Sequence, residues 1–124
     1  MKRIMIIDDS DATRASIECV LIALGHQVVS VENGLDALKE LKAGEPFDLL
    51  ITDIFMPEMD GIEVIEKSRQ LYPDMKIIAI SAGGMGIRGE EMLAIASDLG
   101  AQKVVKKPFS TDDLSAAVTT VLQL

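Results

Sequence analysis

Short apolar stretches alternate with longer amphipathic segments along the whole chain. Five stretches predict strands, at residues 4–7, 27–31, 49–52, 76–80 and 104–105. Runs of this length are typical of strands covered on both faces, as in a parallel sheet. After each stretch, apolar residues recur three and four positions apart, which predicts a helix. The pattern is therefore a strand followed by a helix, repeated five times.

Each predicted helix has one apolar face and recognisable ends. The apolar positions are Ile17, Val20, Leu21 and Leu24; Leu35, Leu38 and Leu41; Ile62, Ile65 and Leu71, with Ser68; Met92, Leu93, Ile95, Ala96 and Leu99; and Leu114, Ala117, Val118, Val121 and Leu122. The predicted boundary residues are Ser10 or Asp11 and Ser110 or Thr111 as caps, Asn33–Gly34 as a turn, and Gly25, Gly44, Pro73 and Gly100 as stops.

Alternation of strands and helices predicts an α/β fold with a five-stranded parallel sheet, helices on both faces and right-handed crossovers. At 124 residues the chain has the length of one domain, which we expect to span residues 1–124. Hydrophobic residues make up 48% of the chain, but only 3% of the residues are aromatic. Aliphatic side chains must therefore build the core.

Charge and composition exclude several kinds of partner. The net charge of −8 argues against direct binding to nucleic-acid phosphates. No apolar run reaches the roughly 20 residues that a membrane-spanning helix needs. The single cysteine, Cys19, excludes an intramolecular disulfide and a zinc site with several cysteines. We therefore expect a cytoplasmic protein that binds neither nucleic acid nor membrane.

Polar residues stand where four of the predicted strands end. They are Asp8–Asp9, Asp53, Ser81 and Lys107. The ends of parallel strands share one edge of a sheet, and open α/β sheets bind ligands at that edge. Each residue alone has a simpler explanation, such as an acid near a helix start, a hydroxyl in a turn or a solvated lysine. Their combination favours a functional site.

Three carboxylates at one edge require positive charge. Two unit charges about 4 Å apart repel by roughly 4 kcal/mol at an effective dielectric constant near 20. Lys107 supplies one positive charge, and a divalent cation would supply more. An all-oxygen site with room for water and phosphate suits Mg²⁺ better than Ca²⁺, with Mn²⁺ as an alternative. Zinc is not expected, because no His or Cys joins the cluster.

These motifs together resemble the receiver domain of bacterial two-component response regulators. The matching residues are Asp8–Asp9, Asp53, Met56–Pro57, Met59–Asp60–Gly61, Ser81–Ala82 and Lys107–Pro108–Phe109. The resemblance covers the whole chain. It implies the flavodoxin-like (βα)5 fold with strand order 2-1-3-4-5, an order that periodicity alone does not provide.

The resemblance implies a phosphoacceptor and a metal site. Asp53 would accept the phosphoryl group. Asp9, Asp53 and the backbone carbonyl of Phe55 would bind Mg²⁺ directly, and Asp8 would act mostly through water. Phosphoryl transfer depends more on in-line positioning and charge neutralisation than on protein acids and bases, so this residue set is consistent with the chemistry.

The resemblance also implies a switch. The Ser81 hydroxyl would contact a phosphoryl oxygen, Lys107 would pair with the phosphoryl group, and the Lys107–Pro108 peptide would be cis. Many receivers carry an aromatic switch residue three positions before this lysine, but here the position is Val104. We therefore predict that coupling runs through Ser81 and the segment after it. Backbone order and exchange with and without a phosphoryl mimic test this, and an unchanged segment 82–91 would contradict it.

The segment Gly83–Glu90 is rich in glycine and about four residues longer than the usual family pattern. A specialised partner-binding or switching loop explains this length, and so does a tolerated surface insertion. Both interpretations stay open.

The function that we predict is a stand-alone response regulator. It would receive its phosphoryl group from a sensor histidine kinase or phosphotransfer protein, beside the first helix. It would signal to an effector protein through the fourth helix, the fifth strand and the last helix, as a monomer or weak dimer. It would not be an enzyme with a metabolite substrate, but would assist its own phosphorylation and dephosphorylation.

Two other classes share parts of the pattern. An aspartyl-phosphate hydrolase pairs its nucleophile with an acid two residues later, where this chain has Phe55. A flavin-binding module of the same topology needs a phosphate-cradling loop and stacking aromatic residues, whereas the first loop here offers acids. Both classes are therefore disfavoured, and phosphorylation chemistry distinguishes them.

Overall fold

The computed structural model describes residues 1–44, 46–54, 61–82, 94, 97–98 and 100–124. The elements are β1 (Arg3–Ile7), α1 (Asp11–Ala23), β2 (Gln27–Val31), α2 (Gly34–Ala43), β3 (Leu49–Asp53), α3 (Gly61–Leu71), β4 (Lys76–Ala82), β5 (Lys103–Lys107) and α5 (Thr111–Leu122). Most of the predicted fourth helix lies outside the described residues. Of the residues of this predicted helix that the structure describes, Ala94, Ser97 and Asp98 are helical.

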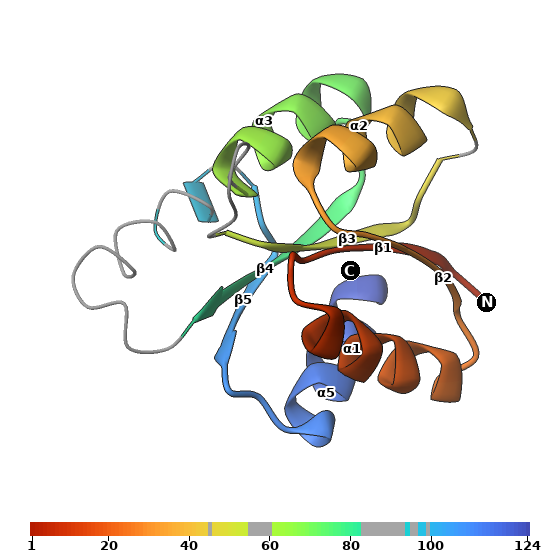
Figure 1. Cartoon of the computed structure of the whole chain (residues 1–124), viewed down its shortest axis with the longest axis vertical. Coiled ribbons are helices and arrows are strands. Elements are labelled where there is room, and N and C mark those ends of the chain that lie inside the picture. The colour runs from red at the N-terminus through yellow and green to blue at the C-terminus, as the bar shows by residue number, and fades with distance from the viewer. Residues whose placement is uncertain (45, 55–60, 83–93, 95–96, 99) are drawn as a thin grey trace.

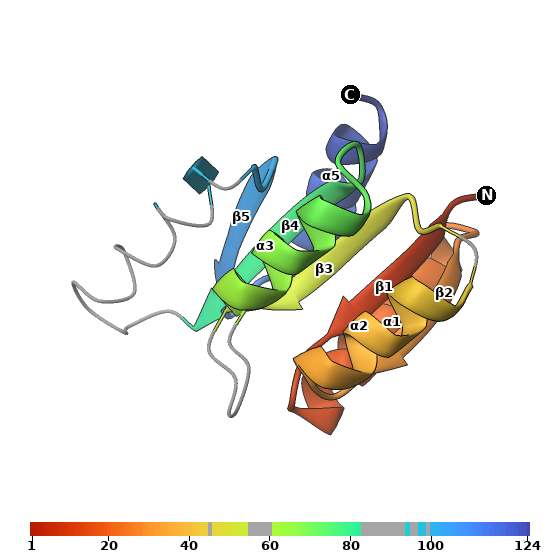
Figure 2. The same ribbon diagram turned by 90° about the horizontal axis from the view of Figure 1, so that it is seen from above.

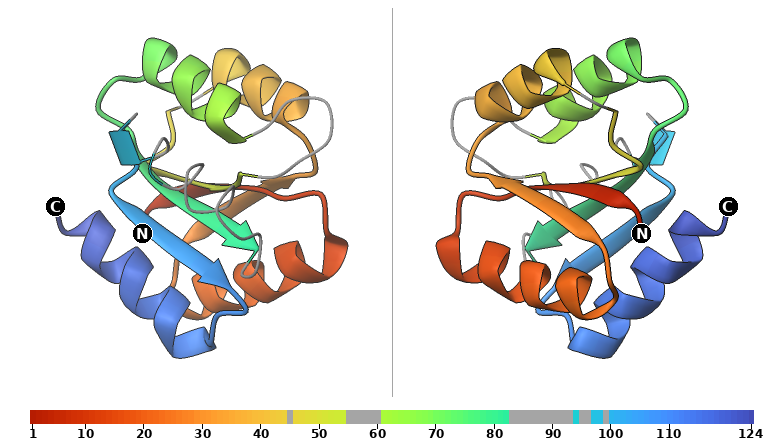
Figure 3. Two further views of the ribbon diagram at one scale, coloured as in Figure 1. Left: turned by 90° about the vertical axis from the view of Figure 1, so that its left-hand side faces the viewer. Right: turned by 90° about the vertical axis from the view of Figure 1, so that its right-hand side faces the viewer.

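All strand pairs are parallel, and the sheet order is β2-β1-β3-β4-β5. This confirms the predicted five-stranded α/β sheet and its strand order. Helices α2 and α3 cover one face of the sheet, and α1 and α5 cover the other (Figures 1 and 3). The layers follow from the crossovers, because each helix returns the chain across a face of the sheet.

The core has two halves that share the strands. Successive residues along a strand point to opposite faces of the sheet. Met5 and Ile7 therefore pack with α2 and α3, while Ile4 and Ile6 pack with α1 and α5. Both halves are almost wholly aliphatic, as the low aromatic content predicts. The continuous apolar stretches are needed because each strand is covered on both sides.

Capping residues begin three helices at the places where local sequence favours them. Ser10, Asn33 and Ser110 are the N-caps of α1, α2 and α5, and each side chain accepts a backbone hydrogen bond from the first helical turn. Asn33–Gly34 is therefore the start of α2, and the separate turn predicted there is wrong. At the end of α1, Gly25 has φ of +87°, which glycine adopts without steric strain.

Helix α3 buries part of the face that the sequence pattern indicated, since Ile65 and Ser68 are both buried as predicted. Its buried residues are Gly61, Val64, Ile65 and Ser68, so Val64 belongs to the core and Ile62 packs only at its border. Leu71, predicted as a core residue, is 39% exposed. Gly61, the first residue of the helix, packs closely against the backbone of Asp53 and Ile54.

The strands end together along one side of the sheet, which we call the carboxyl edge. In Figure 2 their arrowheads share one end of the molecule, and both chain termini lie at the other end, the amino edge. Strand β4 continues to Ala82, and β5 runs from Lys103 to Lys107, so both are longer than predicted. This extra length brings Ser81 and Lys107 to the carboxyl edge within regular strands.

Candidate functional site

An acidic cluster occupies the carboxyl edge between β1 and β3. These strands are neighbours, and Ile7 pairs with Thr52, so the residues that follow lie side by side. Asp8, Asp9 and Asp53 each place one carboxylate oxygen within 4.8 Å of the others. Asp8 and Asp53 are 1% and 5% exposed, whereas Asp9 is exposed. The cluster therefore has a buried side and an open side, with Asp9 on the open one.

Lys107 brings a positive charge into this cluster from the far end of the chain. Its Nζ lies 2.9 Å from Asp8 Oδ2 and 3.3 Å from Asp53 Oδ2, and it donates a hydrogen bond to each. The side chain is 23% exposed. Because β4 lies between β5 and β3, the long side chain must reach across the end of β4 to make these contacts.

The pKa of Lys107 reflects a competition between burial and charge. Burial lowers the pKa, but hydrogen bonds and attraction from Asp8 and Asp53 outweigh it, so the pKa is raised above the ordinary lysine value. Opposite charges at hydrogen-bonding distance favour the charged form. The ammonium group therefore stays protonated at neutral pH and compensates part of the buried negative charge.

Asp8 holds the turn between β1 and α1 in place as well as binding Lys107. Its Oδ1 accepts a hydrogen bond of 2.8 Å from the backbone N–H of Ser10, and its Oδ2 accepts the bond from Lys107. Both carboxylate oxygens thus have protein donors. Its backbone carbonyl accepts a further bond of 2.6 Å from Arg14 Nη1. Asp8 consequently links β1, the start of α1 and β5.

The donor set fits a hard divalent cation. Three carboxylates and one ammonium leave two negative charges uncompensated among these four side chains. The ligands are all oxygens, which suits Mg²⁺ or Mn²⁺. Asp8 receives protein donors on both carboxylate oxygens, and Asp9 lies on the open side of the cluster.

The remaining predicted site residues lie around this cluster or outside the described residues. Ser81 is buried at the end of β4, one residue after the partner of Asp53 in the sheet. Val104 is half-buried and packs against the core below α2 and α3. The Lys107–Pro108 peptide is cis, as the resemblance implied. Phe55 and the segment Gly83–Glu90 lie outside the described residues, so their predicted roles stay predictions.

Two further residues support the site through contacts with the backbone. A Cβ at Gly61 would lie 2.3 Å from the carbonyl oxygen of Asp53 and 2.6 Å from Cα of Ile54, so only glycine fits there. The second residue is Arg14, through its bond to the Asp8 carbonyl. Gly61 belongs to the Met59–Asp60–Gly61 motif of the family resemblance, but no local pattern indicates either contact.

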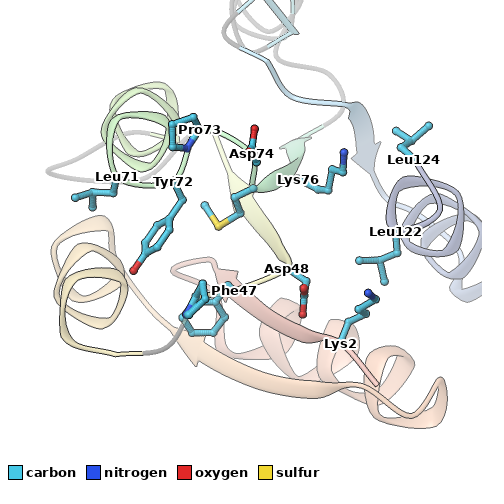
Figure 4. Close-up of a pocket in the computed structure, with 12 residues that line it drawn as sticks. Lys2, Phe47, Asp48, Leu71, Tyr72, Pro73, Asp74, Lys76, Leu122 and Leu124 are labelled. Carbon is cyan, nitrogen blue, oxygen red and sulfur yellow. The ribbon is translucent and has the colours of Figure 1, made fainter.

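A separate cavity lies at the amino edge, away from the acids. Its volume is about 410 Å³, and it opens between the segment before β3, the connection from α3 to β4, and the end of α5 (Figure 4). Phe47, Tyr72 and Met75 contribute apolar surface, and Lys2 and Asp48 contribute charge. It contains none of the residues at the carboxyl edge, so the acidic cluster is the better candidate for chemistry.

Comparison with known proteins agrees with the geometry of the acidic cluster. The family model described as "Response regulator receiver domain" matches residues 4–119. The chain is 38% identical to the response regulator receiver protein CpdR of Brucella abortus, with 98% of both chains covered. It is 36% identical to the chemotaxis protein CheY of Bacillus subtilis, with 97% of both covered.

A solved structure gives the same result for the fold. The CheY-like receiver domain protein of Methanospirillum hungatei superposes with a TM-score of 0.89 at 30% identity, covering 99% of this chain and 94% of that one. Within the part of the chain that the structure describes, no helix is long and apolar enough to cross a membrane.

Proposed function

Because the chain belongs to the response regulator receiver domain family, we propose that it accepts a phosphoryl group on Asp53 in a two-component phosphorelay. The observation that carries this proposal is the contact of Lys107 with both Asp8 and Asp53 inside a cluster of three acids. Such a cluster combines a nucleophilic carboxylate with a cation able to neutralise an incoming phosphoryl group. We infer a cytoplasmic location from the same family membership.

The transfer needs one bond made and one broken. An oxygen of the Asp53 carboxylate attacks phosphorus, the P–N bond of a phosphohistidine on the donor protein breaks, and the imidazole leaves with the electron pair. The product on this chain is an acyl phosphate. Lys107 moves its hydrogen bond from the carboxylate to a phosphoryl oxygen, and the Ser81 hydroxyl contacts another. Little acid–base chemistry is required, because positioning and charge neutralisation supply most of the catalysis.

The cation site belongs to the same proposal. Asp9 and Asp53 would hold Mg²⁺, with Asp8 contributing through water, and the bound ion would neutralise developing charge on the phosphoryl oxygens. The residues of this chain position the acceptor: β3 places Asp53 at the strand end, and Lys107 orients its Oδ2. Water later hydrolyses the acyl phosphate, so the protein assists its own dephosphorylation without converting a metabolite.

Incubation with acetyl phosphate and Mg²⁺ tests the proposal directly. We expect intact-mass spectrometry to show the addition of one phosphoryl group, which is lost in Asp53→Asn and on chelation of the metal. Asp74→Asn is the matched control, because Asp74 is an exposed acid at the amino edge, away from the cluster. Phosphorylation that persists in Asp53→Asn would overturn the proposal.

The same experiment separates the other classes. Steady release of phosphate well beyond one equivalent, without an accumulating phosphoprotein, would indicate an aspartyl-phosphate hydrolase. A bound yellow cofactor in the purified protein would indicate a flavin module. Either result would replace the proposed function.

We further propose that the signal passes by protein–protein contact. The donor would approach the acidic cluster beside α1, and the effector would bind the surface that includes β5 and α5. Monomer or weak dimer is the expected state. Phosphotransfer from each histidine kinase of the source organism would identify the donor, and equal rates from all of them would contradict a dedicated partner.

A further inference from the structure

Arg14 stands at an unusual position for a cation. It is the fourth residue of α1, close to the positive end of the helix dipole, where acidic side chains are favoured and basic ones are not. Its side chain is nonetheless largely buried, with 16% exposed. A costly placement of this kind requires compensating contacts, and the structure contains two.

Both contacts of the guanidinium lead back to the turn between β1 and α1. Nη1 donates a hydrogen bond of 2.6 Å to the backbone carbonyl of Asp8. Nη2 forms a hydrogen-bonded ion pair with the carboxylate of Asp11. The backbone of Arg14 is itself held in the helix by its N–H, which lies 3.0 Å from the carbonyl oxygen of Ser10. A rigid helix therefore presents the guanidinium to the turn.

Together these bonds hold the two neighbours of Asp9. On one side, Asp8 is tied through its N–H to Val31, through its carbonyl to Arg14 and through its carboxylate to Ser10 and Lys107. On the other side, the Ser10 hydroxyl caps the helix by accepting from Thr13 N–H. Asp9 is exposed at the top of this turn, and the direction of its side chain depends on the backbone beneath it.

We propose that Arg14 is a positioning residue for the cation site, acting by fixing the Asp8 carbonyl so that the Asp9 carboxylate faces Asp53. The proposal rests on the function proposed above for this cluster and adds a residue to it. Without the guanidinium, the carbonyl of a residue that is 1% exposed loses its charged donor. The Asp8 carbonyl would then regain a hydrogen bond by turning toward water. That rotation of the Asp8–Asp9 peptide would turn the Asp9 side chain away from the cluster.

The test measures cation affinity independently of phosphorylation. Titration with Mn²⁺ followed by electron paramagnetic resonance, and with Mg²⁺ by calorimetry, gives the dissociation constant of the full-length protein. Removing groups that orient metal ligands typically weakens binding by about 10–100-fold, so we expect Arg14→Ala to weaken cation binding by at least about 10-fold. Arg14→Lys, which keeps one donor, should recover part of the affinity.

Arg69 supplies the matched control. Its guanidinium also donates to backbone carbonyls, including that of Pro73 at 2.9 Å and that of Gly100, but these lie at the amino edge. Arg69→Ala should lower the urea midpoint without changing cation affinity. Equal cation affinity in Arg14→Ala and wild type would overturn the inference, and so would equal losses in Arg14→Ala and Arg69→Ala.

The outcomes separate this inference from the proposed function. If the wild-type protein binds neither cation and takes no phosphoryl group, the proposed function fails. If the wild type does both and Arg14→Ala binds the cation normally, only the role of Arg14 fails. A folded Arg14→Ala variant with weak cation binding that Arg14→Lys partly restores supports it.

Discussion

Replacing Lys107 by Met removes the ammonium group that lies between two buried carboxylates. Methionine keeps most of the length of the side chain, so the change is mainly one of charge. Asp8 and Asp53 would then face each other with no protein cation at 2.9 or 3.3 Å. Because both acids are almost fully buried, water screens their repulsion poorly. The folded state should therefore lose stability at neutral pH.

The structure sets the size of this loss. Carboxylate oxygens of the cluster lie within 4.8 Å of one another. Two unit charges at that separation repel by about 3.5 kcal/mol at an effective dielectric constant near 20. Removing one partner of a buried ion pair typically costs about 3–5 kcal/mol, because the remaining charge is uncompensated. We expect Lys107→Met to lower the free energy of unfolding by about 3 kcal/mol at about pH 7.

Urea denaturation followed by circular dichroism measures the loss. Lys106→Met is the matched control, since Lys106 is the preceding residue of the same strand and its side chain is exposed; it should change stability by no more than about 0.5 kcal/mol. Equal midpoints for the two variants would refute the reasoning.

Three further measurements follow from contacts described above. A Cβ at Gly61 would overlap the Asp53 carbonyl, so Gly61→Ala should cost about 1–3 kcal/mol in urea titration and slow phosphorylation, and a neutral effect on both would contradict the close approach. The Asn33 side chain accepts a hydrogen bond of 2.8 Å from the N–H of Asp36. Asn33→Ala should cost about 1 kcal/mol and Asn33→Ser, which keeps a capping oxygen, much less; equal losses would argue against the cap. The pKa of Lys107 is raised in the folded protein, so above the ordinary lysine value of about 10.4 the unfolded chain loses that proton first. The free energy of unfolding should therefore fall as the pH rises. Alkaline urea titrations should show this fall in the wild type but not in Lys107→Met.

Local sequence signals predicted most of the elements of this fold. Helix caps depend on one side chain and the backbone three residues later, so Ser10 and Ser110 were among the expected caps. Where periodicity alone set the expectation, it was less reliable. On α3, periodicity placed Ile65 and Ser68 correctly but missed Val64, and it included Leu71, which is hydrophobic without being buried.

The candidate site was predictable from the residues at the strand ends, once a parallel sheet was assumed. Asp8, Asp53 and Lys107 each follow or end an apolar stretch, and parallel strands bring such ends together. The roles of Phe55 and Gly83–Glu90 fall outside the described residues and keep the status of predictions. Their identification rests on the family resemblance.

By itself, the sequence determined which segments form strands and helices, where several helices begin, and which polar residues reach one edge of the sheet. Those properties depend on neighbours within a few positions. The tertiary structure alone decided which oxygen of Asp8 meets Lys107, 99 positions away, why Gly61 must lack a side chain, and where the Arg14 guanidinium binds. Such contacts depend on how packed elements rotate and approach, and side-chain volumes far apart in the chain set that packing.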